Sequence, residues 1–210
     1  MGKEDMIILA FETGRVFQDG KFQGFRSHRD FDYIGRVVDN LVSMRRGDAE
    51  VSESHKHPIP YVMIVNPEEK KVFTYQRASK KEHAHEERLH GKWSWGVGGH
   101  VEPEDNEGND PIYSTMIREL EEEVAFDGPV GDHKVLGYIN DDRDEVGKVH
   151  FGVLYLIETL GDVRPANEEM ASGRFLDFGE IEKLCSSEDS NVEGWSEIAV
   201  KPLREYFESL

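Results

Sequence analysis

Residues 98–126, GGHVEPEDNEGNDPIYSTMIRELEEEVAF, combine a glycine pair, an acidic turn and a helical pattern. Apolar residues recur in the second half at the spacing of one helix face, which predicts an amphipathic helix packed on a core. Asp110 followed by Pro111 predicts its start, because Asp caps free backbone N–H groups and Pro suits the first helical position. The expected apolar face consists of Tyr113, Met116, Ile117, Leu120 and Val124.

The same helix carries a run of glutamates. Glu119, Glu122 and Glu123 lie side by side next to the apolar face, whereas Glu121 lies on the other side. Like charges at this spacing cost roughly a few tenths of a kcal/mol each. Two interpretations follow from the residues alone. One is a solvated acidic face, and the other is a site for Mg²⁺ or Mn²⁺, which prefer carboxylate and carbonyl oxygens.

These residues resemble the Nudix box of pyrophosphohydrolases, G-x5-E-x7-R-E-U-x-E-E-x-G-U, in which U is a bulky apolar residue. Gly99 fits the start of the box, and the residues that fit its second half are Arg118, Glu119, Leu120, Glu122, Glu123 and Phe126. Two positions depart from the pattern. Ala125 replaces the box glycine, a mild change in a helix. The first box glutamate is split by a five-residue insertion, so that Asp105 and Asp110 each have one of the two required spacings.

Either aspartate can take the role of the first box glutamate. The capping argument for Asp110 leaves Asp105 or Glu107 nearer the site. In the resemblance, the metal ligands are the Gly99 carbonyl and the side chains of Glu119, Glu122 and Glu123. Arg118 orients the box carboxylates through charge-assisted hydrogen bonds.

The resemblance also implies a catalytic base and contacts to substrate. The base is a carboxylate of the loop 140–147, and we choose Glu145 ahead of Asp142 and Asp144, although nothing local separates them. Arg77, at the end of an expected strand, is predicted to contact a phosphate. Trp93 and Trp95 point the same way on a strand, where they can stack on a base or fill one face of the sheet.

A zinc site is not favoured by spacing. The pairs His55/His57 and His83/His85 have no Cys partners and no second spaced ligand pair. Cys185, the single cysteine, excludes an internal disulfide and is expected to pack rather than to react.

The resemblance implies an α+β fold, an α/β/α sandwich with a mixed sheet between helices. Residues 56–210 form this domain, and residues 1–55 form an N-terminal extension, a hairpin plus a helix, packed on it. The implied activity is Mg²⁺- or Mn²⁺-dependent hydrolysis of a diphosphate bond in a nucleoside diphosphate-linked or related substrate. The alternative is a catalytically inactive Nudix-like nucleotide-binding or regulatory module. The added extension makes a homodimer a reasonable expectation.

The whole chain has 210 residues, 37% of them hydrophobic, and a formal net charge of −18. This composition predicts a soluble globular protein. Its negative field repels a duplex nucleic acid, and an anionic small substrate needs local neutralisation by metal ions. No apolar run is long enough to span a membrane, so a cytoplasmic protein without a membrane partner is expected.

Hydrophobic patterns predict the remaining elements. Strands are expected at 6–10, 60–65, 71–77, 134–139 and 148–157, and a short strand or turn is expected at 173–178. Asp19 and Gly20 predict the turn of a hairpin over residues 16–25. Helices are expected at 30–44, 179–184 and 195–210.

Overall fold

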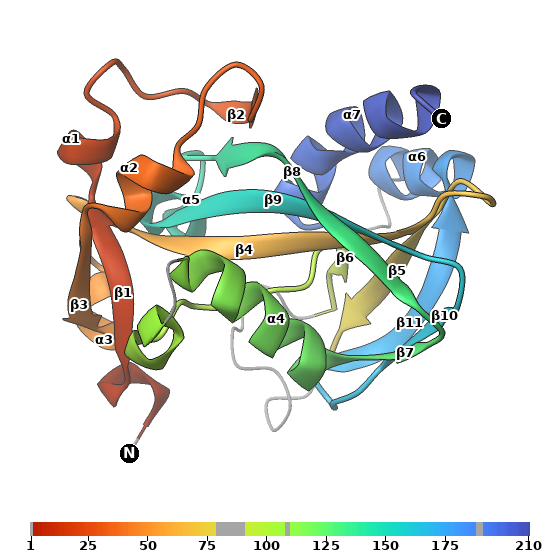
Figure 1. Ribbon diagram of the computed structural model, residues 1–210, viewed down its shortest axis with the longest axis horizontal. Helices are drawn as coiled ribbons and strands as arrows, with labels where there is room; N and C mark the ends of the chain where they lie inside the picture. Colours follow the sequence, from red (N-terminus) through yellow and green to blue (C-terminus); the bar gives the residue numbers. More distant parts are fainter. Residues whose placement is uncertain (1, 79–90, 108–109, 188–190) are drawn as a thin grey trace. The chain divides into compact units, whose positions relative to one another are not determined.

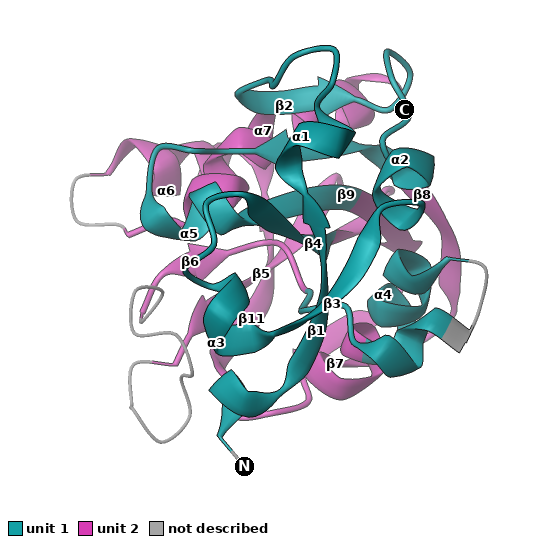
Figure 2. Ribbon diagram, turned by 90° about the vertical axis from the view of Figure 1, so that its left-hand side faces the viewer, with its two compact units in different colours: residues 1–61, 98–118, 135–154 teal, residues 62–97, 119–134, 155–210 magenta. Residues whose placement is uncertain are grey.

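The computed structural model describes residues 2–78, 91–107, 110–187 and 191–210 (Figure 1). The chain forms two compact units (Figure 2). Unit 1 contains residues 1–61, 98–118 and 135–154, and unit 2 contains residues 62–97, 119–134 and 155–210. Strands β4 (His55–Asn66) and β9 (His150–Thr159) and helix α4 (Pro111–Glu123) contribute residues to both units.

In unit 1, the N-terminal segment contributes strands at two places. β1 (Ile7–Glu12) pairs antiparallel with β3 (Leu41–Arg45), and Phe11 at its end pairs with Lys56 of β4. β2 (Gly24–Ser27) pairs antiparallel with β8 (Val130–Asn140), within the strand path β9-β8-β2. Residues before β4 therefore form part of the sheet.

Short helices and an aromatic core complete unit 1. The ring centroids of Phe11 and Phe17 each lie 5.6 Å from that of Phe151. Tyr33 and Tyr138 pack on the same ring, at 5.8 Å each. Aromatic pairs at such distances add stabilisation beyond burial. The short helices are η1 (Lys3–Asp5), α1 (Thr13–Val16), α2 (Ile34–Val38), α3 (Arg46–Ala49), η3 (Pro103–Glu107) and α5 (Glu145–Val149).

Unit 2 is built around β5 (Lys71–Arg77), which has the bounds expected from its pattern. β5 pairs antiparallel with β11 (Met170–Asp177), with β4 and with β6 (Trp93–Ser94). A separate two-stranded sheet consists of β7 (Val124–Asp127) and β10 (Asp162–Pro165), which the patterns did not predict. The closing helices α6 (Phe178–Ser186) and α7 (Gly194–Glu208) are confirmed. None of the helices in the described ranges is both long and apolar enough to cross a membrane.

Helix α4 begins at the expected residue, but its buried face differs from the prediction. The backbone N–H groups of Ile112 and Tyr113 both donate to Asp110 Oδ1 at 3.1 Å, which confirms the cap. Ile112, Met116 and Leu120 are buried, whereas Tyr113 and Ile117 are exposed. The polar Thr115 takes part of the buried face because its hydroxyl donates to Asp105 Oδ2 at 2.9 Å.

The expected N-terminal hairpin and long helix are corrected by the structure. Val16 belongs to α1, and β2 pairs with β8 instead of with a neighbouring hairpin arm. Of the two turn residues only Gly20 has a positive φ, +104°, whereas a type I′ hairpin requires two. The expected helix over 30–44 ends early, because β3 pairs with β1 and the Asn40 amide donates to the Arg36 carbonyl at 2.9 Å.

Candidate functional site

Arg118 and Asp105 form a bidentate ion pair in unit 1. Arg118 Nε donates to Asp105 Oδ1 at 3.1 Å, and Arg118 Nη2 donates to Oδ2 at 3.0 Å. Nη2 also donates to the His100 carbonyl at 3.0 Å, which connects α4 to the loop after the glycine pair. Since Asp110 caps α4, Asp105 is the aspartate that faces the box arginine. The Thr115 hydroxyl and the Glu102 N–H complete the shell of donors around Asp105.

This shell controls the charge of Asp105. Burial alone would raise the pKa of Asp105, but the hydrogen bonds from Arg118, Glu102 N–H and Thr115 outweigh it and lower the pKa. A lowered folded-state pKa stabilises the fold above the unfolded-state value, about 3.9. That contribution is lost as the pH falls through the lower folded-state pKa.

We therefore expect an acid-dependent stability that Asp105→Asn reduces. The wild-type midpoint temperature should fall as the pH drops from about 4 towards 2, and the variant should show a smaller fall because Asn does not titrate. Thermal unfolding followed by circular dichroism between pH 2 and pH 7 measures both curves. Parallel curves for wild type and variant would mean that Asp105 does not carry the effect.

The glycine pair begins a loop that runs close to β4 in unit 1. A Cβ placed on Gly98 would lie 1.7 Å from the carbonyl oxygen of Pro60, a distance that no side chain can occupy. Leu9 N–H donates to the Val101 carbonyl at 2.7 Å, which fixes the other end of the same short stretch. Gly98 is therefore required for the close approach of two backbones, and Gly99 follows it directly.

The box glutamates occupy the last turn of α4, in unit 2. Glu119 is half-buried, Glu122 is exposed, and Glu123 is only 8% exposed. Ala166 N–H donates to the backbone carbonyl of Glu123 at 2.8 Å. This carbonyl at the helix end therefore has a hydrogen-bond partner that does not involve the Glu123 side chain. Positions i, i+3 and i+4 bring the three side chains to one side of a helix, and their oxygens are the donors that a hard cation requires. The donor set fits Mg²⁺ or Mn²⁺.

Arg77 is already paired with an acid in unit 2. Its guanidinium donates to Glu193, whose other carboxylate oxygen accepts from Ser94 Oγ at 2.8 Å. Burial alone would lower the pKa of Arg77, but the Glu193 carboxylate outweighs it, with a smaller contribution from Glu123, and raises the pKa further. Arg77 is therefore a fixed cation in the electrostatic reach of Glu123, and its contact with a phosphate stays a prediction.

The two tryptophans differ in accessibility. Trp95 is buried, and its indole nitrogen has no hydrogen-bond partner within the described ranges. Trp93 is half-exposed, with the Arg174 guanidinium 5.8 Å from its ring centroid. Trp93 is thus the more accessible of the two for stacking, and both roles stay predictions.

The segment predicted to carry the base forms a helix rather than a plain loop. Asp144 caps α5, because its Oδ1 accepts from Gly147 N–H at 2.7 Å. Asp142 accepts from both Lys21 and Lys56 at 2.8 Å. Glu145, with its side chain 73% exposed, forms an ion pair with Lys148 at 2.5 Å. All three carboxylates thus have structural roles or partners, and the choice of Glu145 stays a prediction.

Four residues that local spacing did not bring together form a cluster in unit 1. Potential ligand atoms of Glu50, His57, His100 and His150 all lie within 4.8 Å of one another. They come from separate segments of the chain, so no motif signals them. The spacing of His55 and His57 disfavours a zinc site. In the structure, however, potential ligand atoms of Glu50, His100 and His150 lie within 4.8 Å of those of His57. His83 and His85 lie outside the described residues.

Comparisons with known proteins agree with this fold. The NUDIX domain family matches residues 55–193. The chain is 34% identical to protein YmaB of Bacillus subtilis over 209 residues, which cover 95% of this chain and 98% of YmaB. The crystal structure of Tm1382, a candidate Nudix hydrolase, superposes with a TM-score of 0.75 at 27% identity, over 95% of this chain and 99% of Tm1382.

A more distant structure, the NUDIX domain of Shewanella oneidensis NrtR, shares the fold with a TM-score of 0.54 at 15% identity. That match covers 72% of this chain and 88% of the NrtR domain. The matched family model and the fold thus define a Nudix domain. The chain belongs to the Nudix family and has its mixed α+β fold, with an N-terminal extension before the domain. Nudix proteins typically use a divalent metal ion.

Proposed function

We propose that this protein is a Mg²⁺- or Mn²⁺-dependent pyrophosphohydrolase, which cleaves a diphosphate bond in a nucleoside diphosphate-linked or related compound. The observation that carries the proposal is the last turn of α4, where Glu119, Glu122 and the largely buried Glu123 keep the box positions. Helix α4 is anchored by the Asp105–Arg118 pair although the box glutamate is replaced by aspartate.

The three glutamates hold the ion, and the resemblance adds the carbonyl of Gly99. A bound divalent ion neutralises phosphate oxygens and lowers the pKa of a bound water. Arg118 positions the start of the box by its two hydrogen bonds to Asp105. A net charge of −18 makes local neutralisation a requirement for any anionic substrate.

Two further roles complete the proposal. Glu145 serves as the general base, because it is an exposed carboxylate and, unlike Asp144, is not fixed as a helix cap. Arg77 contacts a phosphate, with its guanidinium held in place by Glu193, and Trp93 or Trp95 stacks on a base.

A screen for hydrolysis of the diphosphate bond, with the phosphomonoester products separated by chromatography, tests the activity. The purified chain is incubated with nucleoside diphosphate sugars, dinucleotides, coenzyme A and oxidised nucleoside triphosphates, with Mg²⁺, with Mn²⁺ or with a chelator. Nucleoside diphosphate sugars come first, because the NrtR domain of the same fold was crystallised with ADP ribose. We expect turnover of at least one class that the chelator abolishes.

The same screen separates the enzyme from a binding module. If the chain binds a nucleotide in a calorimetric titration but hydrolyses no diphosphate bond with either ion, a catalytically inactive regulatory module replaces the enzyme. Metal-independent turnover would contradict the proposed role of the glutamates.

A further inference from the structure

Three histidines and a glutamate converge in unit 1, apart from the glutamate run of α4. Glu50 directly follows α3, His57 lies in β4, His100 follows the glycine pair, and His150 is the first residue of β9. Among the described residues, their potential ligand atoms lie within 4.8 Å of one another. Glu50 precedes the matched Nudix domain, and the three histidines lie inside it.

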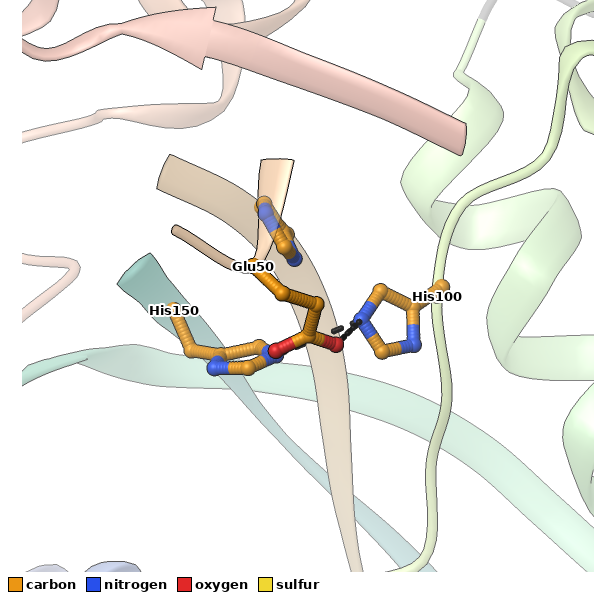
Figure 3. A group of neighbouring side chains, drawn as sticks. Glu50, His100 and His150 are labelled. Atoms are coloured by element: carbon orange, nitrogen blue, oxygen red, sulfur yellow. Dashed lines mark hydrogen bonds and ion pairs between the residues drawn. The ribbon is translucent and has the colours of Figure 1, made fainter. Parts of the chain in front are cut away.

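The distances suit a four-coordinate ion. His150 Nε2 and His100 Nε2 are 3.2 Å apart, and His100 Nε2 is 3.7 Å from Glu50 Oε1. Figure 3 shows the Glu50 carboxylate pointing towards the rings of His100 and His150. Ligands at the bond lengths of tetrahedral zinc are about 3.4 Å apart. Small side-chain movements are therefore enough to bring the set to bonding distance.

Atoms in this cluster lack the partners that buried polar groups require. His57 is fully buried, and neither of its ring nitrogens makes a hydrogen bond within the described part of the chain. The Ala49 backbone lies close to the ring and favours its protonated form, against the larger effect of burial on the pKa of His57. Oε2 of Glu50 is buried and equally without a hydrogen-bond partner there. Buried polar atoms without partners are costly and uncommon in native proteins, and a bound cation would satisfy both residues.

The surroundings prepare the ligands for a metal ion. His150 Nδ1 lies 2.7 Å from the Val146 carbonyl, which can only accept, so Nδ1 carries the hydrogen and Nε2 presents its lone pair. Arg46 Nε lies 3.4 Å from Glu50 Oε1 and orients that carboxylate. Burial lowers the pKa of His57 to about 3 and also lowers that of His100, so both rings are neutral at pH 7.

We propose that Glu50, His57, His100 and His150 bind one divalent transition-metal ion of the zinc class. Imidazole nitrogens suit Zn²⁺ and similar ions, whereas Mg²⁺ prefers oxygen ligands, so the chemistry differs from that of the α4 glutamates. Four protein ligands fill a tetrahedral shell, which is typical of a structural ion. The ion ties Glu50 of the extension to the domain and fixes His100, the residue after Gly99.

The wild-type measurement uses the full chain without a histidine tag, stripped of metal by a chelator. Calorimetric titration with Zn²⁺ should give one ion per chain in the presence of excess Mg²⁺. Co²⁺ should bind with the visible absorption of a tetrahedral nitrogen and oxygen complex. At a hundredfold excess of Zn²⁺ over the dissociation constant, the midpoint of thermal unfolding should rise by about 5–10 °C.

Matched variants locate the ligands. His57→Leu should weaken Zn²⁺ binding by more than about 100-fold, beyond the 10–100-fold typical of outer-shell residues, and Glu50→Gln should weaken it at least tenfold. His55→Ala is the control, because His55 lies on the same strand but pairs with Ser52 and Ser54, and it should bind as wild type does. Without metal, His57→Leu should be at least as stable as wild type, since it removes unpaired buried atoms.

The outcomes are separable from those of the proposed function. Glu123→Gln should keep the wild-type Zn²⁺ affinity whether or not the chain hydrolyses diphosphates. If wild type binds no Zn²⁺, or if His57→Leu and Glu50→Gln both bind it as tightly as wild type, the site is overturned. Loss of Zn²⁺ binding in Glu123→Gln would overturn it as well. Should His57→Leu fail to fold, the partly exposed Glu50→Gln decides alone.

Discussion

Glu123→Gln is expected to reduce metal-dependent diphosphate hydrolysis by more than about 100-fold, beyond the 10–100-fold that outer-shell partners of a metal contribute. Gln keeps the size of the side chain but removes the negative charge that holds a divalent ion. Glu123 is the most buried of the three box glutamates, so water screens its charge least. The substitution also removes a negative charge that helps to raise the pKa of Arg77. The steady-state rate of phosphomonoester formation, measured over a range of Mg²⁺ concentrations, gives both the turnover and the apparent metal affinity.

Glu121→Gln supplies the matched control. Glu121 lies in the same run, is exposed, and occupies the side of α4 away from the other three glutamates. The control should retain turnover within about a factor of two to three, since surface substitutions change stability by only about 0.5 kcal/mol. Both variants should keep the wild-type circular dichroism spectrum. Wild-type turnover by Glu123→Gln, or equal losses of turnover in the two variants, would show that the glutamates form a solvated acidic face and not a specific metal site.

The box helix was the most predictable part of the molecule, because its signals are local. Asp110, Pro111 and the apolar repeat predicted its start correctly, since a cap and a helical period each depend on a few neighbouring residues. The buried face was predicted less well. Tyr113 and Ile117 are exposed while Thr115 is buried. Thr115 can be buried because its hydroxyl donates a hydrogen bond to Asp105.

Long-range pairing decides what the local patterns missed. Residues 41–45 carry enough apolar side chains to continue a helix, yet β1 offers an antiparallel partner, and the segment becomes β3. Because of the insertion between Gly99 and Arg118, the sequence does not decide which of two aspartates takes the role of the first box glutamate. The folded structure shows that Asp105 binds Arg118. The histidine cluster joins residues up to 100 positions apart, so no spacing could reveal it.

Lys56→Met is expected to destabilise the fold by about 3 kcal/mol, which corresponds to a fall of roughly 6–12 °C in the unfolding midpoint. The Lys56 ammonium is fully buried and donates to three acceptors, namely Asp142 Oδ1 at 2.8 Å, the Gly147 carbonyl at 2.6 Å and the His150 carbonyl at 3.1 Å. Burial lowers the pKa of Lys56, and the Asp142 carboxylate opposes that shift. Met fills a similar volume but donates to none of the three acceptors, so all three hydrogen bonds from Lys56 are lost.

Lys21→Met tests whether the buried hydrogen bonds of Lys56 or the charge on Asp142 accounts for the loss of stability, because both lysines bind the Asp142 carboxylate. Lys21 Nζ lies 2.8 Å from Asp142 Oδ2, but its side chain is 41% exposed, and that of Lys56 is 0% exposed. An exposed pair contributes about 0–1 kcal/mol, so Lys21→Met should lower the midpoint by less than about 4 °C. Equal shifts in both variants would mean that the charge on Asp142 matters more than the buried carbonyls. A larger effect at Lys56 identifies this lysine as a residue that holds the segment with Glu145 against β4, since its three acceptors lie before, within and directly after α5.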